Sequence, residues 1–518
     1  MRDVEPAMMQ AWIGHLGATP ENLDPAALRR QLSRGTIPDV LAQTARTHPD
    51  STLTIEEATI TYADLRARAA RAASVLAEHG VVHGERVVIS APTSMAFVVA
   101  YLAGLRLGAV MVLTNPGFTT SELNRVVDRC DPVIVLTDDQ LARTTSVPVF
   151  RMDDLIEATE SAAEHPPVGL DSRDVALLAF TSGTTGLPKG VPLTHGQLLA
   201  SIRSAMLAWR WNSQDILVHA LPLFHQHGLS GIHVSLLAGS KAGVLARFDP
   251  DRLLETIART QATVMFAVPS IHQRLVALDR EQLAPLRRLR LATSGSAPLS
   301  ATLARAYFEK VGMMPLERYG LTETGLNVSN NYEGERTVGA VGYPLPGVEV
   351  ALTDVRGHPV EVGTEGEIVL RGPQVFDGYL DDPAATDAAF WPGQWFRTGD
   401  LGRWDDEGLL IISGRLKELV ITGGMNVVPT EVERVIEQLP GVREAAVAGL
   451  PSERWGEEVA TWVVARAGQQ VSSEQILAHC LDHLAAYKCP KRVFFLDQLP
   501  RNAMGKVTRN QLVPSSRA

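Results

Sequence analysis

Short apolar runs alternate with longer amphipathic segments along most of the chain from about residue 38 onward. The runs at 86–91 and 110–113 predict buried strands. The segments at 63–79 and 96–107, in which apolar residues recur every three or four positions, predict helices. Strands separated by amphipathic helices are typical of parallel sheets with helices on both faces. We therefore predict an α/β fold whose large N-terminal domain contains doubly wound sheets.

The pattern changes after Gly339 and changes again near Gly414. Between these glycines, turn signals such as Pro346-Gly347 and Arg356-Gly357 separate short strands, which predicts a β-rich subdomain. Beyond Gly414 helical and strand-like segments alternate again, which predicts a small α+β C-terminal domain. The predicted parts are an N-terminal extension at 1–37 with short helices at 6–16 and 25–32, a large domain at 38–413 with the β-rich subdomain at about 339–413, and the C-terminal domain at 414–518.

Composition and charge narrow the class of protein. With 518 residues, of which 45% are hydrophobic and 20% charged, the chain is long enough for several globular domains. A net charge of -10 argues against a nucleic-acid partner, and no apolar window is long enough for a membrane span. The three cysteines lack metal-ligand spacing, and the N-terminus lacks the apolar core of a signal peptide. We therefore expect a cytoplasmic protein that binds neither nucleic acid nor membrane.

The segment Phe180–Gly190, which is rich in Gly, Ser and Thr, carries the clearest candidate chemistry. It follows an apolar run at 175–180 and precedes a helix capping box formed by Thr194 and Gln197, so we expect a loop that joins a strand to a helix. Its glycines let backbone amides turn inward, and its hydroxyls and Lys189 add donors and a positive charge. Such a loop suits the oxygens of a polyphosphate, although it lacks the Gly-Lys-Ser/Thr spacing of a Walker A loop.

This loop resembles the phosphate loop of the acyl-adenylate-forming superfamily, which includes acyl-CoA synthetases, adenylation domains and luciferases. Further motifs that are similar to those of the superfamily follow at Ser294–Pro298, Glu317–Thr324, Trp395–Asp400, Gly414–Lys417, Gly423–Asn426 and Pro500–Val507. The resemblance covers nearly all of the chain from about residue 38. It implies an enzyme that uses ATP and Mg²⁺ to convert a carboxylic acid into an acyl adenylate, with release of pyrophosphate. Rotation of the small domain would then allow transfer of the acyl group to the thiol of CoA.

The resemblance implies roles in the adenylation step for residues of these motifs. Tyr319 would stack on the adenine, Thr322 would approach the α-phosphate, and Glu323 would hold Mg²⁺ together with Thr181. Lys506 would bridge the substrate carboxylate and the α-phosphate and so stabilise negative charge in the transition state. The full set implied to bind the nucleotide or CoA is Thr181, Ser182, Gly183, Thr184, Thr185, Gly186, Lys189, Gly295, Ser296, Ala297, Arg318, Tyr319, Gly320, Asp400, Arg415, Lys417, Gly423 and Gly424.

Further roles concern the ribose, the hinge and CoA. By resemblance, Asp400 would accept hydrogen bonds from the ribose hydroxyls and Arg415 would contact the ribose. Lys417 would absorb the change in backbone dihedral angles when the small domain rotates. Gly423 and Gly424 would line the pantetheine tunnel after the rotation, because small residues permit close approach of the backbone.

Two further residues bear on the acid substrate. His225 lies in Leu221–Gly228, which resembles the acid-binding segment of the superfamily, and would lie with Gly320 near the substrate carboxylate. A packed, hydrogen-bonded core histidine is the alternative. The segments at 318–332 and 339–348 resemble malonyl-CoA synthetases most closely. In that subfamily an arginine on a helix after a Val-Pro pair binds the distal carboxylate of malonate.

Arg274 stands at the place that matches this arginine. A guanidinium suits the role because it is planar and permanently charged. The subfamily usually has aromatic residues where Ile271 and His272 stand, and an arginine on the surface of an amphipathic helix is the alternative. Malonate and methylmalonate are the leading substrates for an ATP-dependent acid:CoA ligase.

Two alternatives stay open. The first is an adenylating enzyme of a natural-product pathway, acting on an aromatic or other acid, with a carrier-protein thiol, an amine or nitrite as acceptor. The second is a nucleotide-binding protein without catalysis. The presence of Lys189, Glu323 and Lys506 argues against the second alternative.

Overall fold

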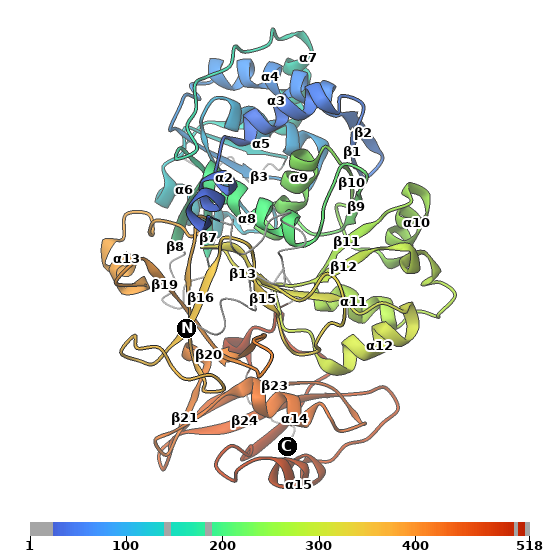
Figure 1. Cartoon of the computed structure of the whole chain (residues 1–518), viewed down its shortest axis with the longest axis vertical. Helices are drawn as coiled ribbons and strands as arrows, with labels where there is room; N and C mark the ends of the chain where they lie inside the picture. The colour runs from blue at the N-terminus through green and yellow to red at the C-terminus, as the bar shows by residue number, and fades with distance from the viewer. Residues whose placement is uncertain (1–23, 139–146, 182–188, 502–505, 513–518) are drawn as a thin grey trace.

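The computed structural model describes residues 24–138, 147–181, 189–501 and 506–512 (Figure 1). Two large sheets with helices packed against them occupy the upper and middle parts of Figure 1, and the C-terminal sheet lies below them. This arrangement is the predicted α/β fold with a small C-terminal domain. Within the described part of the chain, no helix is both long and apolar enough to cross a membrane.

The first sheet has six strands in the order β6-β5-β3-β4-β7-β8, and only the β7–β8 pair is antiparallel. The central strands are buried on both faces, as their uninterrupted apolar runs predict. The strands are β3 (Arg86–Ser90), β4 (Val110–Leu113), β5 (Ile134–Thr137), β6 (Val149–Arg151), β7 (Val175–Thr181) and β8 (Lys189–Thr194). The helices after β2, β3, β4 and β6 are α4 (Tyr62–Glu78), α5 (Met95–Arg106), α6 (Thr120–Cys130) and α7 (Met152–Ser161).

The second sheet has nine strands in the order β15-β14-β13-β12-β11-β9-β10-β1-β2. The six neighbours from β13 to β1 run parallel. The strands are β1 (Thr52–Ile55), β2 (Ala58–Thr61), β9 (Ile216–His219), β10 (Lys241–Val244), β11 (Val264–Ala267), β12 (Leu291–Ser294), β13 (Leu316–Leu321), β14 (Gly325–Ser329) and β15 (Tyr343–Pro344). The remaining helices of this region are α3 (Ile37–Thr47), α8 (His195–Ala208), α9 (Gln226–Ala238), α10 (Pro250–Thr260), α11 (Pro269–Val276) and α12 (Ala301–Val311), with a 3₁₀ turn at Ala284–Arg288.

The structure corrects one prediction, namely that the loop after β7 leads directly into a helix. The chain instead forms β8, which pairs antiparallel with β7, before α8 begins at the capping box of Thr194 and Gln197. The sequence does not predict this strand, because Pro192 interrupts the run of residues that would indicate it. A proline is tolerated there because β8 is the edge strand of its sheet.

Two smaller sheets complete the fold. The β-rich subdomain is an antiparallel sheet in the order β16-β17-β19-β18, with β20 paired to β19. The C-terminal sheet has the order β22-β21-β24-β23, with β25 paired to β24, and it has a core of its own under α14 and α15. The elements are β16 (Glu349–Thr353), β17 (Gly366–Arg371), α13 (Pro383–Ala389), β18 (Phe390–Trp391), β19 (Trp395–Trp404), β20 (Leu410–Arg415), η3 (Leu416–Glu418), β21 (Val420–Thr422), β22 (Met425–Val427), α14 (Pro429–Ile436), β23 (Val442–Ser452), β24 (Gly456–Ala465), α15 (Ser473–His483), β25 (Arg492–Phe495) and η4 (Arg509–Gln511).

The end of the predicted N-terminal extension is part of the folded structure. The helix expected at 25–32 is present as α2 (Pro25–Leu32), which lies beside α8, whereas the helix expected at 6–16 lies outside the described residues. Arg29 pairs with Glu349 of β16, and Leu32 is buried. Arg203 of α8 donates to the carbonyl oxygens of Leu32 at 2.7 Å and Arg34 at 2.6 Å. The segment therefore connects α8 with the β-rich subdomain.

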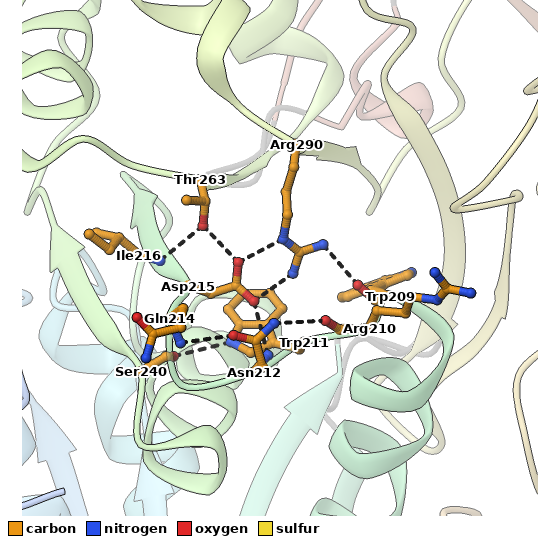
Figure 2. A network of polar contacts seen from close by, with 10 residues as sticks. All are labelled: Trp209, Arg210, Trp211, Asn212, Gln214, Asp215, Ile216, Ser240, Thr263 and Arg290. Carbon is orange, nitrogen blue, oxygen red and sulfur yellow. Dashed lines mark hydrogen bonds and ion pairs between the residues drawn. The ribbon is translucent and has the colours of Figure 1, made fainter. Parts of the chain in front are cut away.

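A polar network holds together the amino ends of the parallel strands (Figure 2). Asp215, which precedes β9, accepts two hydrogen bonds from Arg290, which precedes β12, each at 2.6 Å. Thr263, which precedes β11, donates to the same carboxylate at 2.7 Å. Trp211 donates to Ser240, which precedes β10, at 3.1 Å. The network lies at the end of the sheet opposite to the carboxyl ends of its strands, so its role is in the fold.

Candidate active site

Candidate residues from three strands meet at one edge of the nine-stranded sheet. Because β9, β12 and β13 belong to one run of parallel strands, their carboxyl ends lie along the same edge. His225 follows β9, Ser296 follows β12, and Tyr319 lies near the end of β13. In open α/β sheets ligands bind at this edge.

Asp400 joins the β-rich subdomain to this edge. Its carboxylate accepts a hydrogen bond from the Tyr319 hydroxyl at 2.6 Å and pairs with Arg415 at 2.7 Å, and the residue is only 2% exposed. Burial raises the pKa of the Tyr319 phenol, and the Asp400 charge adds to this effect. Three predicted residues from β13, β19 and β20 therefore form one group, joined by a hydrogen bond and an ion pair.

A second group forms around Tyr379, which sequence reasoning did not identify. Its hydroxyl donates to Glu323 at 3.2 Å, and the Lys189 ammonium lies 4.6 Å from the centroid of its ring. Thr181 is the neighbour of Lys189 across the β7–β8 pair. Tyr379 thus connects the end of the phosphate loop with Glu323. The sequence carries no signal for it, because it lies between the recognisable motifs.

Burial raises the pKa of the Glu323 carboxyl group, and the hydrogen bond from Tyr379 acts against this effect. Among the described residues no cation forms an ion pair with Glu323. The described residues also contain no group of three His, Cys, Asp or Glu side chains that would hold a metal without further ligands. One carboxylate and one hydroxyl suit Mg²⁺, which usually takes most of its other ligands from water and substrate phosphates.

Two histidines belong to the segment that follows β9. The Gln226 side chain donates to the Thr322 carbonyl at 3.0 Å, which holds this segment against the turn that carries Glu323. Burial, with a smaller contribution from the charge of Lys506, lowers the pKa of His225 to about 4, so the ring is neutral at pH 7. His227 is buried, and its Nδ1 lies 3.1 Å from the Ser296 hydroxyl. Sequence reasoning missed His227, although its position two residues after His225 is a usable signal.

The loop after β12 has a special backbone. Ser296 has a φ of 68°, which is uncommon for a residue other than glycine. Gly295 packs so closely on Arg318 that an added Cβ would lie 2.6 Å from its Nε, and Ala297 follows as a partly buried residue. Gly320 approaches the backbone of Gly325 where β13 and β14 change register. These close approaches explain why the chain has glycine at both positions.

Lys506 reaches the same site from the C-terminal domain. Removal from bulk water lowers the pKa of its ammonium, and the charge of Arg415 lowers it further, while Asp400 and Glu418 act in the opposite sense. Its own charge acts on His225. The residue is exposed to solvent in the structure.

Other predicted residues lie apart from this group. Arg274 is exposed near the end of α11, and its guanidinium lies 4.6 Å from the centroid of the Phe248 ring. Lys417 is exposed within η3. Gly423 and Gly424 form the turn between β21 and β22 with φ values of 58° and 79°, which favour glycine. The predicted residues Ser182, Gly183, Thr184, Thr185 and Gly186 lie outside the described part of the chain.

Comparisons with known proteins show the family of the chain. The chain matches the family model described as AMP-binding enzyme over residues 41–380, and the model of the AMP-binding enzyme C-terminal domain over residues 431–506. ATP-bound MatB from Rhodopseudomonas palustris is 38% identical in sequence with a TM-score of 0.87, covering 91% of this chain and 97% of that one. An oxalate–CoA ligase of Arabidopsis thaliana is 34% identical, covering 87% and 92% of the two chains. A feruloyl-CoA synthase of an Amycolatopsis species is 34% identical, covering 90% and 96%.

The fold and the site define an enzyme that forms acyl adenylates, as the motifs predict. The chain belongs to the AMP-binding enzyme family, and within it the protein is an AMP-forming acyl-CoA synthetase. It joins a carboxylic acid to CoA with ATP. The names of the relatives specify different acids, so membership of the family does not by itself define the substrate.

Proposed function

We propose that this acyl-CoA synthetase activates a short dicarboxylic acid, with malonate or methylmalonate as the leading substrate. The proposal is supported by the likeness to MatB, a malonyl-CoA synthetase, which extends over 91% of this chain. The motif around Tyr319 and the segment 339–348 resemble the same subfamily. Arg274 and Arg318 supply positive charge on α11 and β13 for a second carboxylate.

The single observation that carries the assigned mechanism is the convergence of Lys506 on the group around Asp400 and His225. When the acid carboxylate attacks the α-phosphate of ATP, two anionic groups meet, and negative charge moves from the carboxylate to the α-phosphate oxygens and the departing pyrophosphate. A lysine ammonium between them stabilises that charge. His225, which is neutral at pH 7, forms hydrogen bonds near the carboxylate without adding a charge.

Asp400 and Tyr319 would orient the nucleoside. The hydrogen bond from Tyr319 and the ion pair with Arg415 fix the direction of the Asp400 carboxylate and leave lone pairs free for the ribose hydroxyls. The Tyr319 ring offers a flat apolar face to the adenine. Because the carboxylate is already oriented, binding of ATP loses less side-chain entropy there.

Glu323, Thr181 and Lys189 would hold the phosphates. Mg²⁺, bound by Glu323 and Thr181, would supply positive charge to the phosphate oxygens. Lys189 adds a point charge at the end of the phosphate loop, and Tyr379 contacts its ammonium through the ring and the Glu323 carboxylate through the hydroxyl. Gln226 keeps the turn with Thr322 and Glu323 in place.

The second half-reaction requires that Lys506 leave and that CoA enter. We assign the hinge to Lys417, which is exposed and lies between β20 of the large domain and β21 of the small one. The domain boundary then falls in the segment 414–417, and the glycine turn at Gly423 and Gly424 would approach the pantetheine arm after rotation. A cytoplasmic location fits the three buried cysteines, which are all free thiols.

A panel of carboxylic acids tests the substrate. Pyrophosphate release is measured with malonate, methylmalonate, acetate, oxalate and ferulate, each with and without CoA, and the products are identified by mass spectrometry. We expect the highest kcat/KM with malonate or methylmalonate and the corresponding acyl-CoA as product. Preferred turnover of ferulate or acetate would contradict the dicarboxylate assignment and leave the adenylation mechanism intact.

A further inference from the structure

Residues 375–380, which we call the connecting segment, join β8 to the turn that carries Glu323. Near the start of the segment the Phe376 amide donates to the Glu323 carbonyl at 2.9 Å. At its end the Leu380 amide donates to the Gly190 carbonyl of β8, also at 2.9 Å. Gly190 packs so closely on the segment that an added Cβ would lie 3.0 Å from the Cβ of Leu380. The backbone of the connecting segment is therefore fixed both to the end of the phosphate loop and to the turn with Glu323.

Gln197 of α8 fixes the same segment from a third side. Its side-chain amide donates to the Val375 carbonyl at 2.9 Å and to the Asp377 carboxylate at 3.1 Å. Its Oε1 accepts from the Thr194 amide in the capping box of α8, which fixes the direction of the side chain. Phe376 is buried, with 2% of its surface exposed. Contacts with α8, β8 and the turn leave the connecting segment little freedom, so a side chain that starts from it has a defined position.

The side chain of Tyr379 starts from this segment and contacts a charged group through each of its two parts. Its hydroxyl donates to Glu323 at 3.2 Å, and the Lys189 ammonium lies 4.6 Å from the centroid of its ring. The ring packs edge-to-face on Phe376, with centroids 4.9 Å apart, and the Tyr379 amide donates to Thr386 at 2.9 Å. Burial raises the pKa of the phenol, and the charge of Glu323 adds to this effect, so the hydroxyl is a donor at pH 7.

We propose that Tyr379 is a positioning residue for the binding of ATP with Mg²⁺, in which its hydroxyl orients the Glu323 carboxylate and its ring restrains the Lys189 ammonium. This inference rests on the proposed function, which gives Glu323 and Lys189 their roles, and Tyr379 acts through these two residues. A hydrogen bond orients a metal-binding carboxylate, and loss of such a partner lowers metal affinity by about 10- to 100-fold. A restrained lysine loses less side-chain entropy when it meets a phosphate.

The test measures binding without turnover. The ligand is α,β-methylene-ATP, in which the bond that adenylation breaks is replaced by a stable one. Its dissociation constant is measured by calorimetry without metal and with Mg²⁺, and the ratio of the two values reports how much the metal adds to nucleotide affinity. The variants are Tyr379→Phe, Tyr379→Leu, Glu323→Gln and the double variant Tyr379→Phe/Glu323→Gln. Tyr343→Phe, which removes a hydroxyl that donates to the Glu407 carbonyl at 3.1 Å, serves as the control.

We expect Tyr379→Phe to lower the ratio by about 10-fold and to leave the metal-free affinity unchanged, because it removes the hydroxyl and keeps the ring. Tyr379→Leu should also weaken metal-free binding, by about threefold, since the ring no longer restrains Lys189. In the Glu323→Gln background, Tyr379→Phe should change the ratio no further, because a residue that acts through Glu323 then has no carboxylate to orient. The control should match the wild-type protein.

Each result decides the proposal. A wild-type ratio in Tyr379→Phe, beside a lowered ratio in Glu323→Gln, would overturn the role of the hydroxyl. Equal effects of Tyr379→Phe with and without Glu323→Gln, or equal weakening with and without Mg²⁺, would also overturn it and indicate a structural role. Unchanged metal-free affinity in Tyr379→Leu would overturn the role of the ring. An unchanged ratio in Glu323→Gln would contradict the proposed function of Glu323 itself, and this inference with it.

Discussion

Lys506 and Glu317 illustrate what burial does to single charged residues near the site. Lys506 is exposed, and the pKa of its ammonium is lowered. Binding of ATP would place negative charge beside the ammonium and so raise this pKa again. Glu317 is buried, with 7% of its surface exposed, and its carboxyl group accepts a hydrogen bond from the Leu299 amide. The first residue is suited to act on a ligand, whereas the second holds the loop after β12 in place.

Lys506→Ala is expected to abolish adenylation and spare the fold. The exposed side chain contributes little to stability, but the charge it supplies acts in the transition state, so we expect pyrophosphate release to fall by about 100-fold or more. The melting temperature is measured alongside. Lys491→Ala, which removes an exposed lysine of the same domain, serves as the control. Unchanged pyrophosphate release in Lys506→Ala would remove this residue from the mechanism.

Glu317→Gln is expected to change how stability depends on pH. Burial raises the pKa of the Glu317 carboxyl from 4.5 to about 7, so the folded protein keeps this proton at pH values where the unfolded chain has lost it. The free energy of unfolding of the wild-type protein, relative to that of the neutral variant, therefore falls as pH rises from about 4.5 to about 7. The total decrease is about 3 kcal/mol, and the difference is constant above that range.

The measurement is thermal unfolding of both proteins at pH 5 and pH 8, with Glu309→Gln, an exposed acid of α12, as the control. We expect Glu317→Gln to gain stability relative to the wild type at pH 8. The same difference between the two proteins at both pH values would show that the carboxyl group does not titrate in this range.

At the scale of elements, the amino ends of the parallel strands are joined by polar contacts, whereas their carboxyl ends carry the candidate site. The Asp215 carboxylate accepts hydrogen bonds from Arg290, Thr263 and the Asn212 amide (Figure 2). These donors belong to segments that precede β12, β11 and β9. Although burial opposes ionisation, these donors lower the pKa of Asp215. The network therefore stabilises the strand order without touching the site.

Arg290→Met is expected to destabilise the protein without a direct effect on catalysis. The Asp215 side chain is 3% exposed, so removing Arg290 leaves a buried carboxylate without its cation, at a cost of about 3–5 kcal/mol. We expect a lower urea midpoint and an unchanged KM for ATP in the protein that remains folded. Arg288→Met, which removes an exposed arginine two positions earlier, should change stability by less than about 0.5 kcal/mol. Equal midpoints for the two variants would contradict the assigned role.

At the scale of the whole molecule, Arg509 connects the segment after Lys506 with the proposed hinge. It donates to Glu418 of η3 at 2.6 Å, to Glu433 of α14 at 2.8 Å and to the Val447 carbonyl at 3.1 Å. Glu418 follows the proposed hinge residue Lys417, and Arg509 follows Lys506 by three positions. We infer that this network makes the hinge and the Lys506 segment move as one body.

Arg509→Gln is therefore expected to impair adenylation more than thioester formation. A small displacement of Lys506 lowers the rate of the step that uses it, and we expect a decrease of about 10-fold or more in pyrophosphate release. Transfer from a synthetic acyl adenylate to CoA, measured separately, should decrease less. Arg492→Gln, in an exposed position of β25, is the control. Equal decreases in both half-reactions would point to a general loss of structure in the C-terminal domain.

The sequence by itself determined the fold class, the enzyme class and most of the elements. Apolar periodicity and capping residues act over a few positions, so α2 and β4 lie at their predicted bounds, and the capping box at Thr194 and Gln197 is present. The motifs around Tyr319 and Asp400 are likewise local, and they identified the adenylating family before any contact between them was known.

Only the tertiary structure decided which of these residues face one another. It placed β8 before α8, put Tyr379 between Lys189 and Glu323, and buried His272 completely against Tyr307. It also separated Arg318 from its neighbour Tyr319, because adjacent residues of a strand point to opposite faces. Such relations depend on the pairing of strands far apart in the chain, and no local pattern records which side chains of separate strands will meet.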